Sequence, residues 1–175
     1  MKKQLLFYLL ATFILASCGS IYVEYDYDEK ASFNNYKTYN YDFGEGTGLS
    51  EFDDRRFIKY TDSVLQLKGL ILSDNPDLWV TLVSEEYETQ SRNTLGVGLG
   101  GGGGNVGVGV SGGIPIGGRE LHQNIQVSMI NSTSNTVVWE AISDSDVKLK
   151  SNPAQRDAYF QKLAAKIFKK YPPEQ

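Results

Sequence analysis

The sequence has one cysteine, one histidine and no excess of basic residues, and each of these shortages excludes a kind of chemistry. Cys18 has no second thiol to pair with, so neither a disulfide nor a thiolate metal cluster is expected. His122 alone cannot form a histidine-rich metal site. The 17 basic side chains are outnumbered by 21 acidic ones, and phosphate contacts need a basic surface. We therefore expect no cofactor, no metal and no nucleic-acid partner.

The start of the chain has the pattern of a bacterial lipoprotein signal. Two lysines precede mainly apolar residues 5–16, a run that is too short to cross a bilayer but suits a secretory signal. Small residues then lead directly into Cys18, which resembles a lipobox. By this resemblance residues 1–17 form a signal peptide that is removed, Cys18 receives acyl chains, and residues 18–20 form a short tether. Two or more acyl chains hold a protein stably on a membrane.

The residues after the cysteine indicate the destination of such a lipoprotein. Gly19 is not the aspartate that retains many lipoproteins on the inner membrane, and no acidic cluster of the kind that often marks surface export follows closely. We expect an outer-membrane anchor with the domain facing the periplasm. Without residues 1–17 the chain keeps 15 basic and 21 acidic side chains, so attachment is expected to rest on the acyl chains of Cys18. An envelope protein is the other partner that we consider.

Hydrophobic periodicity predicts a small set of strands and helices in the rest of the chain. Period-two alternation indicates strands, and apolar stripes at helical spacing indicate helices. Ser50 and Asn152 are suitable N-caps, and Asn152 and Gln155 together form a capping box. The run Leu78 to Val83 is apolar on both faces, which is typical of a central strand. The predicted elements are strands over 21–28, 38–43, 78–83, 121–130 and 137–142, and helices over 51–68 and from 153 to about 171.

This order predicts an α+β fold, β-β-α-β, a glycine-rich hairpin, and β-β-α. Because each helix has one apolar stripe, both should pack on one face of a mostly antiparallel sheet. Residues 21–173 are expected to form a single domain, which is large enough to fold without a disulfide.

The glycine-rich insertion, residues 94–118, holds 13 of the 18 glycines. Its segment 96–101 fits G-x-G-x-x-G, but no helix follows, so a nucleotide site is not expected. The favoured interpretation is a flexible or weakly paired hairpin, because glycine in strands is costly. The alternative is a docking surface that another chain or a glycan approaches closely. The apolar residues of that candidate surface are Val97, Leu99, Val106, Val108 and Val110.

Six short motifs follow one another along the chain after the signal. They are Val23–Asp28, Phe33–Tyr39, Leu67–Leu70, Asp77–Val80, Val137–Glu140 and Ile167–Pro173. In this order they resemble bacterial envelope lipoproteins of the domain-of-unknown-function family 4136, and the resemblance covers nearly all of the chain after the signal. It implies an α+β lipoprotein domain with no established activity and no catalytic residues to carry over.

No motif of a known catalytic site is present, so we expect a non-catalytic interaction or accessory module and not an enzyme. His122 is interpreted as a solvated or strand-edge histidine. One alternative is a lipid-anchored hydrolase, which needs a cleft lined by two carboxylates, such as Asp26 and Asp28 or Asp144 and Asp146. The other is a binder of a small ligand or glycan, for which Tyr22 and other outward aromatics should be exposed together.

Overall fold

The computed structural model describes residues 21–90, 94–96, 113–115, 119–148 and 150–174. Within these residues no helix is both long enough and apolar enough to span a membrane. Two short 3-10 helices, η2 and η3, accompany the strands and α-helices. The elements are β1 Ile21–Tyr27, η2 Phe33–Asn35, β2 Thr38–Tyr41, α2 Glu51–Leu67, β3 Ile71–Leu72, β4 Leu78–Gln90, β5 Thr94–Gly96, β6 Gly113–Pro115, β7 Arg119–Asn131, β8 Thr136–Lys148, α3 Pro153–Ile167 and η3 Phe168–Lys170.

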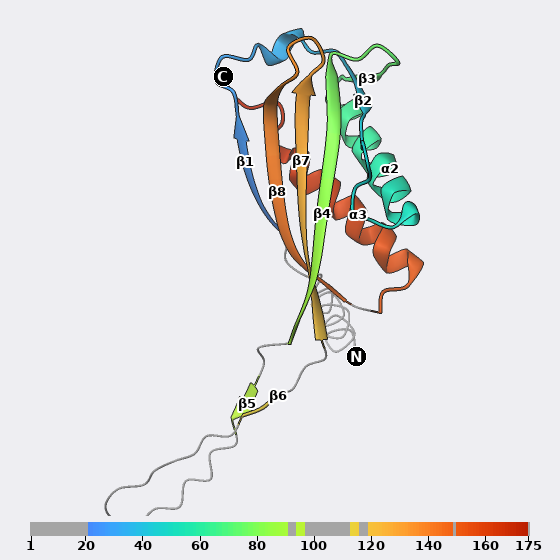
Figure 1. The fold of residues 1–175 in the computed structure, drawn as a ribbon, viewed down its shortest axis with the longest axis vertical. Helices are drawn as coiled ribbons and strands as arrows, with labels where there is room; N and C mark the ends of the chain where they lie inside the picture. The colour runs from blue at the N-terminus through green and yellow to red at the C-terminus, as the bar shows by residue number, and fades with distance from the viewer. Residues whose placement is uncertain (1–20, 91–93, 97–112, 116–118, 149, 175) are drawn as a thin grey trace, which may run out of the picture.

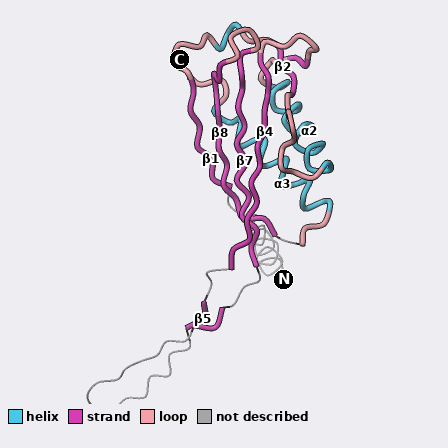
Figure 2. Tube along the Cα trace, in the orientation of Figure 1, coloured by secondary structure: helices cyan, strands magenta, loops and turns pink. Residues whose placement is uncertain are grey.

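A six-stranded sheet in the order β1-β8-β7-β4-β2-β3 forms the body, and both helices lie on one side of it (Figure 1). The pairs β1–β8, β8–β7 and β7–β4 are antiparallel, whereas β2 pairs in parallel with both β4 and β3. In Figure 2 the helices, in cyan, lie on one side of the sheet that the magenta strands form. The predicted α+β class is therefore confirmed.

Alternation along the long strands places one set of side chains under the helices. Ile125, Val127 and Met129 of β7 are fully buried there, and so is Trp139 of β8. The Trp139 ring stacks on Phe168 with centroids 5.5 Å apart, which joins the sheet to the end of α3. Complete burial of each such side chain contributes about 1.5–3 kcal/mol, so this face supplies most of the folding free energy.

Several element limits differ from those that the sequence predicts. β4 continues to Gln90 and β8 to Lys148, well past the apolar runs, because the backbone ladder continues where side chains are polar. The helix α3 ends at Ile167, and the next three residues form η3 instead. β4 is central in the sheet, as predicted, but it is not covered on both faces, since Val83 is 54% exposed.

Both predicted N-caps are present. The Ser50 side chain accepts the backbone N–H of Asp53, and Asn152 forms a reciprocal capping box with Gln155. Each such cap satisfies backbone donors that the first turn leaves unpaired, which is worth about 1 kcal/mol.

Asp53, in the first turn of α2, also joins the two helices through a charged network. Its side chain is 8% exposed and accepts from Arg156 of α3 and, at 2.7 Å, from Arg56 of α2. Burial acts to raise the pKa of Asp53, but the hydrogen bond and charge of Arg156, with hydrogen bonds from Arg56 and Ser50, outweigh it, so the pKa is lowered. A carboxylate held in this way stabilises the fold only while it is ionised.

We predict that Asp53→Asn lowers the free energy of unfolding by about 3 kcal/mol at pH 7, because it leaves two half-buried guanidinium groups without their anion. The folded-state pKa of Asp53 lies below the unfolded value of about 3.9, so the contribution is complete above that value and is lost as pH falls through the folded pKa. Urea unfolding at pH 7 and pH 3 measures this, with the exposed Asp74→Asn as control. An equal loss of stability for both variants at pH 7 would contradict the prediction.

Candidate functional site

The residues that the sequence proposed as sites lie outside the described ranges. These are Cys18 and the candidate surface Val97, Leu99, Val106, Val108 and Val110. At the two ends of the glycine-rich insertion, β5 and β6 pair antiparallel, with Leu95 opposite Ile114.

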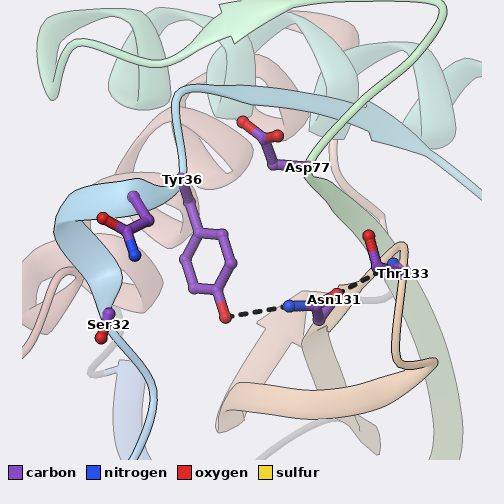
Figure 3. Close-up of a pocket in the computed structure, with 6 residues that line it drawn as sticks. Ser32, Tyr36, Asp77, Asn131 and Thr133 are labelled. Atoms are coloured by element: carbon purple, nitrogen blue, oxygen red, sulfur yellow. Dashed lines mark hydrogen bonds between the residues drawn. The ribbon is translucent and has the colours of Figure 1, made fainter.

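A polar pocket of about 270 Å³ lies at the end of the sheet where η2, the start of β4 and the β7–β8 turn meet (Figure 3). The Tyr36 ring stands in it, and its hydroxyl accepts a hydrogen bond of 3.1 Å from the Asn131 side chain. Asn131 in turn holds the turn by accepting the backbone N–H groups of Thr133 and Ser134. Hydroxyl, amide and carboxylate groups thus surround an aromatic ring. The pocket is lined by Ser32, Asn35, Tyr36, Asp77, Asn131 and Thr133.

Asp77 fixes the floor of this polar pocket. Its carboxylate accepts the backbone N–H groups of Lys37 and Thr38, at 2.8 and 2.9 Å, and its own N–H donates to the Thr38 hydroxyl. The hydrogen bond from Lys37 is the main cause that lowers the pKa of Asp77, so the side chain is ionised at neutral pH. A charged acceptor therefore ties the η2–β2 connection to the start of β4.

The sheet face away from the helices, here called the open face, is a second candidate surface. On it Ile142 and Val83 are 38% and 54% exposed, and they flank Gln126 in one cross-strand row. Strand spacing of about 4.8 Å puts these two apolar side chains about 10 Å apart. Among its described side chains six are acidic and none is a lysine or arginine. The open face comprises Tyr22, Glu24, Asp26, Trp79, Thr81, Val83, Glu85, Tyr87, His122, Asn124, Gln126, Ser128, Glu140, Ile142, Asp144 and Asp146.

His122 lies on the open face in β7, near the start of the strand, which follows the glycine-rich insertion. Its ring stacks on Tyr87 with centroids 5.3 Å apart, and its Nδ1 is 2.9 Å from Asp146 and 3.8 Å from Asp144. The two aspartates thus share one strand face, as the alternation predicts. No group of three metal-binding side chains occurs within the described part of the chain. The side chain is 28% exposed, so it is half-buried rather than fully solvated.

A shallow cleft at the β1 end of the open face meets the condition set for the hydrolase alternative. Three acidic residues line it, namely Asp26, Asp28 and Glu140. Glu140 accepts from Gln126 at 2.6 Å and from Ser128 at 3.1 Å, which holds one of its oxygens in the sheet. The cleft keeps the hydrolase hypothesis open as a prediction, because nothing in it identifies a substrate or a nucleophile.

The small-ligand hypothesis requires Tyr22 and other outward aromatic side chains to be exposed together, and this condition is met in part. Tyr22 and Tyr25 are 62% and 44% exposed and line the same cavity beside the end of α3. Tyr87 is exposed elsewhere, against His122.

Comparison with known proteins identifies the family. The model of a domain of unknown function, DUF4136, matches residues 23–173. The chain belongs to this family. No curated protein matches the chain.

Two solved structures share the fold of this DUF4136 domain. A PDZ domain protein from Parabacteroides distasonis has a TM-score of 0.53 and 15% identity over 95% of this chain, which spans 40% of that protein's length. The PelC dodecamer from Paraburkholderia phytofirmans also has a TM-score of 0.53, with 13% identity over 89% of this chain and 100% of PelC. At these identities the likeness is one of fold.

Sequence patterns did not reveal the polar pocket, although Tyr36 and Asp77 both lie in family motifs. Its residues come from three separate connections, and no spacing along the chain brings them together. The available signal was Asn75-Pro76-Asp77, a turn sequence that ends in a potential backbone acceptor just before β4.

We predict that Asp77→Ala loosens the polar pocket, because two backbone N–H groups lose a charged acceptor. The expected loss in the free energy of unfolding is about 2 kcal/mol. Amide hydrogen exchange should quicken at Lys37 and Thr38 more than at Ile125 in the core. The exposed Asp74→Ala is the control, and unchanged exchange at Thr38 would argue against the role given to Asp77.

Proposed function

We propose that this DUF4136 chain is a lipid-anchored, non-catalytic interaction module of the cell envelope that binds another polypeptide through the open face. The sequence features that support the anchor are the signal pattern and Cys18. On these features we propose that the domain faces the periplasm from the outer membrane, with the acyl chains as its membrane partner. The observation that carries the interaction is the open face itself, where exposed Val83, Ile142 and Tyr87 lie among acidic side chains.

The charge of the open face limits what it can bind. Two copies that met face to face would set acids such as Glu85 and Asp144 against acids, which is unfavourable. A partner must therefore bring basic groups around an apolar centre. A self-assembly would use a heterologous contact, in which the open face of one copy meets a different surface of the next. Contacts of that type close into rings or grow as filaments.

Another copy of the chain is the first partner to test, because PelC, which shares the fold, forms a dodecamer. We predict that the mature chain in detergent forms oligomers by native mass spectrometry and that Val83→Asp combined with Ile142→Asp shifts it to monomer. Two added charges at the centre of a contact should weaken it at least about 100-fold. Salt should also weaken the assembly, because basic and acidic groups meet in it.

The control is Leu67→Asp, which introduces one such charge at an apolar side chain that is 89% exposed on α2. It should leave the oligomers unchanged. A wild-type chain that is monomeric at all concentrations would overturn self-assembly, and the same variants would then be compared for cross-linking to other envelope proteins. Loss of cross-linking in the Leu67 variant alone would contradict the open face as the interface.

Binding of a hydroxyl-rich ligand such as a glycan is a second candidate function, and the polar pocket favours it. An aromatic ring beside amide, hydroxyl and carboxylate groups, as Tyr36 lies beside Asn131 and Asp77, provides both stacking and hydrogen bonds for a sugar.

We predict that N-acetylglucosamine oligosaccharides shift the NMR signals of Tyr36, Asn131 and Thr133. Thr133→Ala should weaken this binding about fivefold to tenfold, the cost of one hydrogen bond. Ser63→Ala, which removes an exposed hydroxyl on α2, is the control. Shifts spread evenly over the surface, or none at all, would dismiss the candidate.

A further inference from the structure

A cavity of about 310 Å³ lies between the edge strand β1 and the end of α3, separate from the polar pocket and adjoining the open face at Tyr22. Its floor is apolar, with Ile21 and Ile167 both buried. Tyr22 and Tyr25, whose side chains leave opposite faces of the edge strand β1, line it on that side. Exposed Lys166, Lys169 and Lys170 line the other side.

The charge of this cavity is opposite to that of the chain. Three ammonium groups come from the last turn of α3 and from η3, and no described acidic side chain lines the cavity. Glu24, which accepts the Tyr22 hydroxyl at 3.1 Å, lies outside the lining. Lysines near a helix C-terminus complement the helix dipole, which accounts for part of this pattern. The dipole does not account for two exposed tyrosines on the facing wall. Lysine clusters bind phosphate, and tyrosine is enriched at membrane interfaces.

The position of the cavity along the chain gives the second argument. Ile21 lies in its floor, and the Ile21 carbonyl accepts the Lys166 ammonium at 2.6 Å. Only three peptide steps separate Ile21 from Cys18, a reach of at most about 11 Å. An acylated Cys18 would therefore keep the cavity at the depth of the lipid headgroups.

We propose that this cavity binds the phosphate of a membrane lipid headgroup and so holds the β1 edge of the domain against the membrane beside its anchor. The inference rests on the lipid anchor proposed above. The lysines bind the phosphate, and the two tyrosine rings lie among the headgroups. It adds to the expectation that attachment rests on the acyl chains of Cys18, because the basic groups are local to the anchor and four of the six acidic groups of the open face lie on β4 and β8.

The test is lysine footprinting on the full lipidated chain in vesicles. One set of vesicles contains phosphatidylglycerol, and the other is an uncharged galactolipid without phosphate. Acetylation of each lysine is followed by mass spectrometry. We expect Lys166, Lys169 and Lys170 to react roughly fivefold more slowly on phosphatidylglycerol, since one lysine at an anionic surface contributes about that factor. Exposed Lys30 and Lys37 are internal controls and should react equally on both.

Charge-reversed variants show whether the cavity acts as a unit. In Lys169→Glu combined with Lys170→Glu, the difference in Lys166 reactivity between the two vesicles should disappear. In the matched Lys30→Glu with Lys37→Glu, the difference should remain. Equal reactivity of Lys169 and Lys170 on both vesicles would overturn the proposal.

Three further outcomes separate the alternatives. In the first, inorganic phosphate is added to the galactolipid vesicles. If it protects Lys169 and Lys170 to the same extent as phosphatidylglycerol vesicles do, the cavity is a site for free anions and not a membrane contact. If Lys169 and Lys170 stay protected in detergent, they contact an acidic protein surface, such as the open face of another copy. That result would also overturn the proposal of headgroup binding. Mass spectrometry of the N-terminal peptide tests the anchor itself. If Cys18 carries no acyl chains, the anchor and this inference are both refuted. If Cys18 is acylated but Lys169 and Lys170 are not protected, the inference alone is refuted.

Discussion

The fold depends on one constraint, which is that both helices must share a single face of the sheet. The buried apolar side chains of β4 and β7 point to that face, and α2 and α3 meet over it. Asp53 fixes how they meet, since one carboxylate accepts guanidinium groups from both helices. With both helices on one side, the opposite face has no cover from the described chain, and its surface is available for recognition.

The three candidate surfaces differ in chemistry because they differ in position relative to this constraint. The open face is acidic with apolar side chains at its centre. The polar pocket forms at the end of the sheet, where connections meet and backbone groups need acceptors such as Asp77. The basic cavity forms at the β1 edge, where the end of α3 brings its lysines beside the start of the domain. Because the three surfaces lie in different places, occupation of one would leave the other two accessible.

Local patterns in the sequence predicted local structure well. The caps at Ser50 and Asn152, the two helices and the hairpin of β7 and β8 follow from periodicity and capping, which depend on neighbours within four residues. Contacts between distant residues were not predicted. Arg156 reaches Asp53 across 103 residues, and β1 pairs with β8, a choice that alternation alone does not make. The polar pocket was missed for the same reason, because Tyr36 and Asn131 are 95 residues apart.

The place of β1 also determines how the domain bears mechanical load. β1 starts at Ile21 and runs antiparallel to β8 over seven paired residues. The Lys166 ammonium donates a hydrogen bond to the Ile21 carbonyl. Tension applied at the start of β1 acts along the strand axis, so it shears all of these hydrogen bonds together instead of peeling them one by one. A domain pulled along β1 from this end therefore resists extension better than one whose strands are separated in turn.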